Sequence, residues 1–188
     1  YAVARAAREA GASVTLVSGP TALEVPAGVK RIGVRTAQEM FDAVKKSVEG
    51  VDIFIAVAAV ADYRVANVAA QKIKKGGRKG MTLELTENPD ILAHVAGMKK
   101  HPFCVGFAAE SEKLAEHAKE KRRSKRIALL AANLAQEALG ADDNALTLFD
   151  DAGEHKLGRG PKLDQARKLM AHISAMLGKK GKPRRAQA

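Results

Sequence analysis

The chain alternates between short apolar runs and longer stretches in which apolar and polar residues are mixed with helical spacing. The apolar runs have the length of strands, and most carry no charge; they lie at residues 13–17, 29–34, 51–61, 103–106 and 127–132. Such runs are typical of strands that helices cover on both faces. The amphipathic stretches between and after them predict helices at residues 2–10, 37–48, 91–99, 112–125 and 163–177.

Capping signals support several of these helices. Thr36 is followed by Glu39 three residues later, which is a capping box, while Asp90 is a good N-cap. The order of the elements predicts an α/β fold, namely a Rossmann-like, doubly wound, mostly parallel sheet with helices on both faces. In this fold residues 51–61 form a central parallel strand, and residues 145–149 form a further strand near the C-terminus.

A β-hairpin is predicted to leave this sheet. Residues 71–75 and 81–86 are short alternating stretches, and a glycine-containing turn at residues 76–80 separates them. The apolar residues of the second stretch share one face. Because an apolar face outside the sheet needs a cover, either the same domain or a partner subunit must supply it.

The 188 residues are predicted to form one domain over residues 1–177, followed by a basic, disordered tail at residues 178–188. No apolar run reaches the ~18 residues that a membrane helix needs, and no signal peptide is visible, so no membrane contact is expected. The single cysteine, Cys104, lies in an apolar run and is interpreted as a buried structural thiol. This use of cysteine favours a reducing cytoplasm.

The formal net charge of +11 is concentrated in three basic blocks, at residues 72–79, 119–126 and 179–185. Basic blocks attract anionic partners of any kind, nucleic acid included. A basic nucleic-acid-binding protein is therefore one alternative. Against it, the chain has two tyrosines, no tryptophan and no interleaving of basic and aromatic residues for base stacking.

Several common catalytic patterns do not occur in this sequence. There is no G-x-G-x-x-G fingerprint and no serine in a nucleophile-elbow context. The five histidines show no metal-ligand spacing; they are His94, His101, His117, His155 and His172. Covalent catalysis and zinc chemistry are therefore not expected.

The most suggestive chemistry follows the strand at residues 51–61. Asp62 comes where that strand leaves the sheet, and ligands of open α/β sheets bind at the carboxyl ends of strands. Lys72 follows ten residues later in a lysine-rich stretch, and a carboxylate near lysines suggests a nucleotide phosphate with its metal. Each residue also has a structural interpretation, because Asp62 could cap a turn, and Lys121 and Lys125 could complement a helix dipole.

Four short motifs together resemble one family. They are A-A-V-A-D-Y-R at residues 58–64, K-I-K-K at residues 72–75, N-P-D-I at residues 88–91 and G-F-A-A-E at residues 106–110. In order and spacing they are similar to phosphopantothenate-cysteine ligase, the CTP-dependent half of the bifunctional coenzyme A biosynthesis flavoprotein. The resemblance covers about residues 1–177.

The resemblance implies a set of site residues, which are Asp62, Lys72, Glu87, Asn88, Pro89, Asp90, Phe107, Lys121 and Lys125. By this resemblance Asp62 contacts the nucleotide on its ribose and Mg²⁺ side, and Lys72 is the catalytic lysine that holds the triphosphate. The loop at residues 87–90 and Phe107 frame the cytosine. The two lysines of the second basic block also bind CTP.

The implied reaction joins 4'-phosphopantothenate to L-cysteine through an acyl-cytidylate, with release of pyrophosphate and CMP. The resemblance also implies a homodimer held by the hairpin between residues 63 and 87, small-molecule substrates and no nucleic acid. FMN would belong only to a fused decarboxylase domain outside these residues. The family's loop S-S-G-K-M-G would precede Tyr1, so this segment alone is expected to be inactive.

One further departure from the family and one further alternative stay open. The family often has an aspartate after the asparagine that ends the last parallel strand, whereas Asn133 is followed by Leu134. A nicotinamide-dependent oxidoreductase would keep the same fold, but it needs an acidic residue at the end of the second strand. Val34 is followed there by Arg35.

Overall fold

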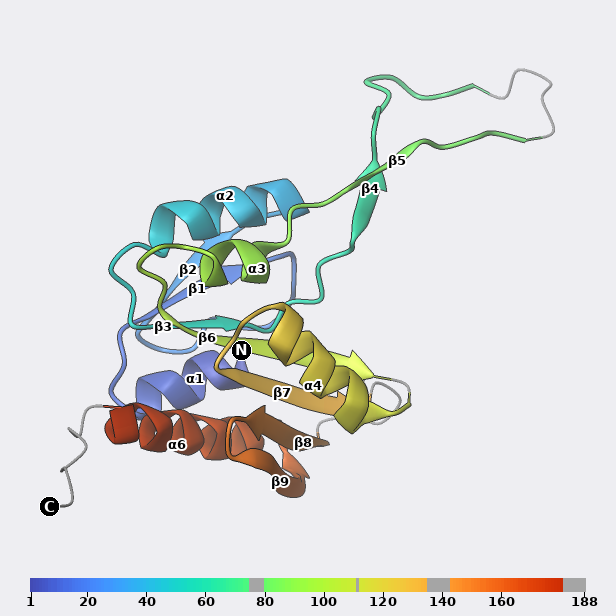
Figure 1. The fold of residues 1–188 in the computed structure, drawn as a ribbon. Helices are drawn as coiled ribbons and strands as arrows, with labels where there is room; N and C mark the ends of the chain where they lie inside the picture. The colour runs from blue at the N-terminus through green and yellow to red at the C-terminus, as the bar shows by residue number, and fades with distance from the viewer. Residues whose placement is uncertain (75–79, 111, 135–142, 181–188) are drawn as a thin grey trace, which may run out of the picture.

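The computed structural model describes residues 1–74, 80–110, 112–134 and 143–180 (Figure 1). The strands are β1 (Val14–Ser18), β2 (Val29–Gly33), β3 (Ile53–Ala56), β4 (Tyr63–Val65), β5 (Leu85–Glu87), β6 (Phe103–Glu110), β7 (Leu129–Leu134), β8 (Asp143–Asp150) and β9 (Gly153–Pro161). The helices are α1 (Ala2–Glu9), α2 (Ala37–Ser47), α3 (Ile91–Ala96), α4 (Leu114–Ser124) and α6 (Lys162–Lys180).

The larger sheet has the strand order β3-β6-β7-β8-β9, while β1 and β2 form a separate parallel pair. Strands β3, β6 and β7 run parallel, and β8 and β9 continue the sheet antiparallel. The prediction of a mostly parallel α/β fold is thus confirmed. The predicted strand at residues 51–61 is wrong in its length, because β3 ends at Ala56; among the described residues β3 pairs with β6 alone and lies at an edge instead of the centre. All four of its residues are half-buried, as expected for an edge.

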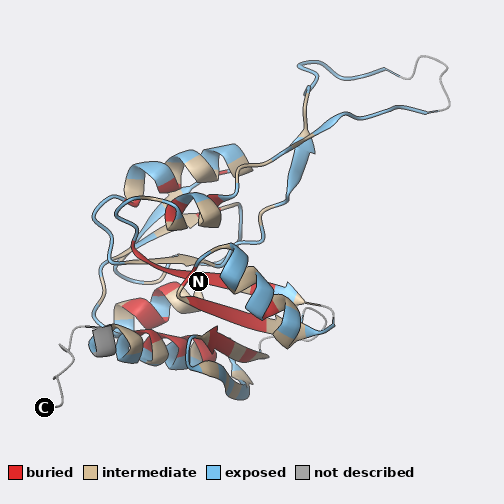
Figure 2. Ribbon diagram, viewed as in Figure 1, coloured by how far each residue is buried: buried red, intermediate tan, exposed pale blue. Residues whose placement is uncertain are grey.

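Helices cover both faces of the larger sheet, as predicted. Helices α1 and α6 pack with Leu129 on one face, and α2, α3 and α4 pack with Leu130 on the other. Neighbouring residues of one strand therefore enter different cores, which is the consequence of the two-residue period of a strand. Figure 2 shows that the buried residues concentrate on the middle strands and on the helix faces toward them.

The predicted helix caps are present. The Glu39 amide donates to Thr36 Oγ1 at 3.1 Å, and the Glu39 carboxylate accepts from the Arg35 amide at 2.7 Å. At α3 the Ala93 amide donates to Asp90 Oδ1 at 2.9 Å. Two helix ends differ from the prediction by three residues: α3 ends at Ala96, with Gly97 as its C-cap, and α6 continues past residue 177 to Lys180. Residues 178–180 are therefore helical, and the rest of the predicted disordered tail lies outside the described residues.

A hairpin leaves the sheet where one was predicted, but its paired residues lie nearer the domain, and only Leu85 and Thr86 belong to both a predicted and an observed strand. Strands β4 and β5 pair antiparallel close to the domain, whereas residues 72–74 and 81–84 are not in strands. Those residues are exposed, so packing does not hold them in an extended ladder. We call residues 63–74 and 80–87 the arm, which projects away from the domain in Figure 1. Most of the predicted turn at residues 76–80 lies outside the described residues.

Strand β9 was not predicted. Its sequence, GEHKLGRGP, contains Leu157 as its only large apolar residue, so the periodicity of a buried strand is absent. Pairing with β8 and contact with α6 nevertheless hold it at the end of the sheet. Whether such an edge strand forms depends on its neighbours in the fold, because its outer side needs no apolar residues.

Cys104 lies within β6 and is 3% exposed. Burial raises the pKa of its thiol to about 11, which keeps it protonated and unreactive. Its interpretation as a structural thiol agrees with this environment. Among the described residues, no helix combines the length and apolarity required to cross a bilayer.

Candidate nucleotide site

A cleft of about 1130 Å³ separates the β1–β2 pair from the larger sheet. Strands β1 and β3 both line it, together with residues that follow each of them, such as Gly19 and Asp62. The cleft therefore reaches the carboxyl ends of two parallel strands, which is where open α/β sheets bind their ligands.

The cleft brings together eight of the nine predicted site residues. Those that line it are Asp62, Glu87, Asn88, Pro89, Asp90, Phe107, Lys121 and Lys125. They come from four separate parts of the chain: the end of the loop after β3, the last residue of β5 with the three residues that follow it, strand β6, and the C-terminal end of α4 with its C-cap. The ninth, Lys72, is exposed on the arm and does not line the cleft.

Hydrogen bonds join the end of the loop after β3, at Ala61 and Asp62, to Asn88 after β5. The Asn88 amide donates to the backbone oxygen of Asp62 at 2.7 Å, and Asn88 Nδ2 donates to the Ala61 oxygen at 2.8 Å. Arg64 donates to Asn88 Oδ1 at 3.2 Å and also to the Glu87 backbone oxygen. These bonds fix the position of Asp62 relative to the N-P-D loop.

Arg64 was not among the predicted site residues. It lies in the A-A-V-A-D-Y-R motif, so the motif offered a signal, but sequence spacing gives no indication that its guanidinium crosses to Asn88. Only the antiparallel pairing of β4 with β5 brings the two residues together.

Asp90 connects two helices at the rim of the cleft. One carboxylate oxygen caps α3, and the other forms an ion pair with Lys125 at the C-terminal end of α4. Burial, the largest single effect, raises the Asp90 pKa, but hydrogen bonds from Lys125 and the Ala93 amide, with the charges of Lys125 and Lys121, lower it overall. Asp90 thus caps α3 and Lys125 lies at the end of α4, as their structural interpretations predicted, and both residues also line the cleft.

Phe107 is held at the cleft by the close packing of β6. The neighbouring Gly106 has no room for a side chain, because a Cβ there would lie 2.8 Å from Ile127 Cδ1 and 2.9 Å from Leu92 Cδ2. Glycine lets β6 approach α3 this closely. The next residue, Phe107, is half-buried and lines the cleft.

Asp62 presents an exposed carboxylate to the cleft. Within the described part of the chain, no ion pair engages this carboxylate. Mg²⁺ is commonly bound through one or two carboxylates together with substrate phosphates, so a single aspartate near lysines fits such an ion. The residues present are therefore compatible with a metal that arrives with a nucleotide.

Comparisons with known proteins agree with these motifs. The profile of the DNA/pantothenate metabolism flavoprotein C-terminal domain matches residues 1–177. The chain belongs to this family. The coenzyme A biosynthesis bifunctional protein CoaBC of Vibrio vulnificus is 43% identical over 183 residues, which are 95% of this chain and 46% of that protein. CoaBC of Escherichia coli K12 is 49% identical over 163 residues, covering 84% of this chain and 40% of that protein.

A solved member of the family has the same fold. The crystal structure of the C-terminal domain of coenzyme A biosynthesis bifunctional protein CoaBC superposes with a TM-score of 0.80 at 35% identity, covering 95% of this chain and 82% of that one. The present chain spans less than half the length of the two bifunctional relatives.

Proposed function

We propose that this chain forms most of the active site of a CTP-dependent phosphopantothenate-cysteine ligase of coenzyme A biosynthesis. The observation that carries the proposal is the convergence of eight predicted site residues, from four separate segments, on one cleft at the carboxyl ends of parallel strands. The names of the bifunctional relatives support the same pathway.

In the proposed reaction the carboxylate of 4'-phosphopantothenate attacks the α-phosphorus of CTP and expels pyrophosphate. The amine of cysteine then attacks the resulting acyl-cytidylate, forming the amide and releasing CMP. Neither step requires a protein nucleophile, because both are displacements between bound substrates. The protein contributes by positioning the reactants and by neutralising charge.

The cleft offers both kinds of contribution. Lys121 and Lys125 place positive charge at one end of α4, where a triphosphate would be neutralised. Lys125 would then share its charge between the nucleotide and Asp90. Asp62 is the residue proposed to hold Mg²⁺, which when bound would offset triphosphate charge.

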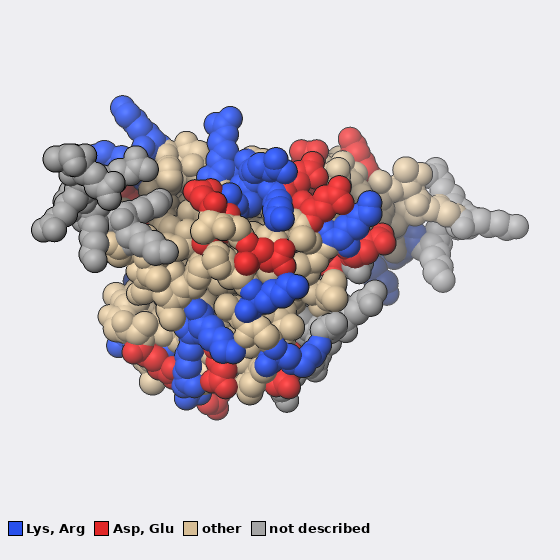
Figure 3. Space-filling model, turned by 60° about the horizontal axis from the view of Figure 1, so that its bottom comes forward, with Lys and Arg blue, Asp and Glu red and all other residues tan. Residues whose placement is uncertain are grey.

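Outside the cleft, the basic side chains are mixed with acidic ones. On the face drawn in Figure 3, acidic side chains lie between the basic ones of the described residues. This mixture favours a localised anion site in the cleft over a continuous basic track along that face.

We propose that recognition of cytosine comes from the loop at residues 87–90 together with Phe107. The loop is held in place by Asn88 and by the Asp90 cap, so its backbone groups have fixed positions. A rigid loop and an aromatic ring can discriminate bases, because unpaired polar groups of a wrong base would be costly.

The open edges of β1 and β3 fit an additional strand. Both strands line the cleft, and within the described residues each pairs with another strand on one side only. By the family resemblance, a strand and a glycine-rich loop are expected before Tyr1. We propose that this strand pairs with both edges and brings its loop to the nucleotide phosphates.

The arm is the proposed dimer contact. Val68 is 82% exposed and Ile73 is 62% exposed, and Met81, Leu83 and Leu85 are also exposed large apolar residues. A second copy of the chain would cover this surface. Lys72 lies on the same arm, so the arm must approach a cleft, in either subunit, for this lysine to meet the triphosphate.

The test is nucleotide choice in the full-length protein. With phosphopantothenate and cysteine, pyrophosphate release is expected to be at least about tenfold faster with CTP than with ATP, the smallest discrimination that pocket contacts give. Equal turnover with both nucleotides would remove the cytosine assignment. No amide product with either nucleotide would overturn the ligase proposal itself.

A further inference from the structure

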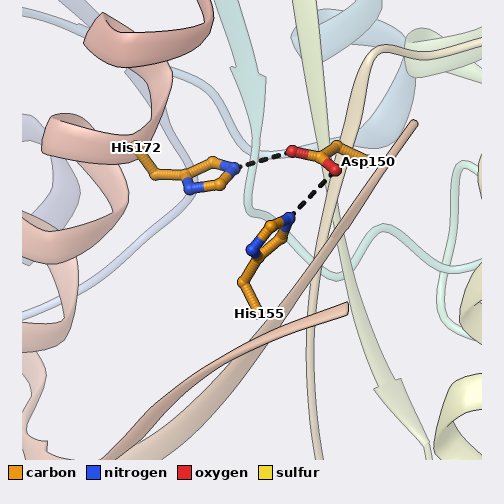
Figure 4. A group of neighbouring side chains, drawn as sticks. All are labelled: Asp150, His155 and His172. Atoms are coloured by element: carbon orange, nitrogen blue, oxygen red, sulfur yellow. Dashed lines mark hydrogen bonds and ion pairs between the residues drawn. The ribbon is translucent and has the colours of Figure 1, made fainter. Parts of the chain in front are cut away.

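Two histidines and one aspartate lie close together where β8 and β9, the last strands of the larger sheet, contact α6 (Figure 4). Asp150 is the last residue of β8, His155 is on β9 and His172 is on α6. His155 Nε2 lies 3.0 Å from Asp150 Oδ1, and His172 Nε2 lies 2.9 Å from Asp150 Oδ2. Three elements thus direct one polar group each to a common point.

Backbone hydrogen bonds orient the Asp150 carboxylate independently of the two histidines. The amides of Ala152 and Gly153 donate to Asp150 Oδ1 at 2.8 and 3.1 Å, because the chain turns between β8 and β9 there. The Asp150 side chain is only 5% exposed, whereas that of His155 is 35% exposed. The group is therefore a rigid carboxylate at the bottom and a solvent-accessible imidazole at the entrance.

Together with general coordination chemistry, this arrangement points to a metal site. The ligating atoms of Asp150, His155 and His172 all lie within 4.8 Å of one another. In a tetrahedral zinc site with bonds near 2.0–2.1 Å, ligand atoms are about 3.3 Å apart, so small side-chain rotations would suffice. We propose that these three residues bind a late first-row divalent cation, with Zn²⁺ as its best representative.

The ligand set also indicates which cations are excluded. Two imidazole nitrogens and one carboxylate suit zinc and its neighbours, whereas Mg²⁺ prefers an octahedral shell of oxygen atoms. None of the three residues lines the cleft, so this site is separate from the Mg²⁺ proposed beside Asp62. Three protein ligands leave one coordination position for water.

The competing interpretation is a purely structural hydrogen-bond cluster that ties β8 and β9 to α6. The chain provides a matched comparison for it, namely His117, whose Nδ1 lies 3.4 Å from Glu110 Oε2. That pair has one histidine and one carboxylate, and the described residues do not supply a third ligand there. Replacing His117 removes a histidine–carboxylate contact without touching the proposed metal site.

The experiment is a titration of the metal-stripped, purified protein with Zn²⁺ in the presence of excess Mg²⁺, followed by calorimetry. One equivalent of Zn²⁺ is expected to bind. His155→Gln and His172→Gln should each weaken binding by about 100-fold or more, because even outer-shell changes cost 10–100-fold. His117→Gln should leave the affinity unchanged.

Co²⁺ serves as a second, spectroscopic probe of the unaltered protein. Visible absorption bands of four-coordinate Co²⁺ are expected at one equivalent, and Zn²⁺ should displace them. The proposal fails if Zn²⁺ binding does not saturate at one equivalent, or if His117→Gln weakens binding as much as His155→Gln and His172→Gln do. Circular dichroism of each variant shows whether it folds; for one that does not, the Co²⁺ spectrum of the unaltered protein decides.

Discussion

The cleft and the arm both carry residues predicted to contact the nucleotide, but they differ in what holds those residues in place. In the cleft, Asn88 and Asp90 are fixed by hydrogen bonds to backbone and to Lys125, and Phe107 follows a tightly packed glycine. On the arm, Lys72 is exposed, and it lies between exposed apolar residues. The cleft is thus organised by the chain itself.

If Lys72 contacts the triphosphate as proposed, the arm must be held in that position by something outside one chain. A bound nucleotide, a second copy or both could supply the missing contacts, since exposed apolar side chains gain free energy when they are covered. The cleft should keep its geometry without such help. Four experiments test this division, from the largest expected effect to the smallest.

The largest effect is expected at the arm's lysine. In the full-length protein, Lys72→Gln should slow acyl-cytidylate formation by roughly 10² or more, about 2.7 kcal/mol, the scale of losing one preorganised charge contact. Pyrophosphate release measures this step. The control replaces Lys179, Lys180 and Lys182 together, which removes more charge at the C-terminal end but no proposed site contact.

At ordinary salt, charges farther away than a Debye length of about 10 Å are largely screened, so the triple variant should keep nearly the full rate. Equal, modest losses in both proteins would mean that the lysines act as a diffuse field. An unchanged rate for Lys72→Gln would mean that the cleft neutralises the triphosphate without the arm.

The second experiment tests how tightly the wall of the cleft is packed. Gly106→Ala introduces a methyl group into a space that Leu92 and Ile127 already fill, so it should lower the free energy of unfolding by about 1–3 kcal/mol. Denaturant unfolding measures the change. Gly33→Ala on β2 is the control, because its added Cβ meets no atom within 4 Å. Similar losses in both variants would contradict the packing argument.

The third experiment tests the apolar surface of the arm. Val68→Lys combined with Leu83→Lys should weaken self-association by at least about tenfold, or 1.4 kcal/mol, because the charges would be buried on assembly. Analytical ultracentrifugation measures the dissociation constant. Leu23→Lys changes an equally exposed leucine outside the arm and should have no effect. A loss of association with Leu23→Lys alone would place the interface elsewhere.

The smallest effect concerns Asp90 and pH. Its pKa in the folded protein is lowered from the ordinary value of 3.8, so its stabilising contribution is complete above pH 3.8 and disappears as the pH falls through the folded pKa. Asp90→Asn keeps a capping side chain but removes the charge. The unfolding free energies of the two proteins should therefore converge below pH 3.8. Parallel curves across this range would show that Lys125 does not stabilise the carboxylate.

The elements that were predicted well are those whose residues carry a local signal. The Thr36 and Asp90 caps, the buried strands at Cys104 and Leu130 and the hairpin after Asp62 could all be recognised from spacing and composition. Local patterns suffice there because caps and strand periodicity involve residues that are close in the chain. Asp62 could also be recognised from its place after a strand, whereas the roles of most other site residues in the cleft could be named only through the family resemblance.

The elements that were missed depend on pairing between distant segments. Strand β9 has one large apolar residue, so its existence follows from β8 and α6 beside it. The short strand β3 contains an apolar sequence suited to the sheet centre, yet it lies at an edge of the five-stranded sheet. Neighbours decide both cases, because a strand's environment is a property of the sheet.

The sequence by itself determined the α/β class, the helix starts and the set of chemically suggestive residues, since these rest on short-range periodicity and side-chain type. Only the tertiary structure decided which of them meet. It gathered Asp62, Asn88 and Lys125 in one cleft and left Lys72 on the arm. It also brought His155 and His172 to Asp150, although their spacing suggested no metal site. Strand pairing and helix packing set these distances, and the physical reason is that both join segments far apart in the chain.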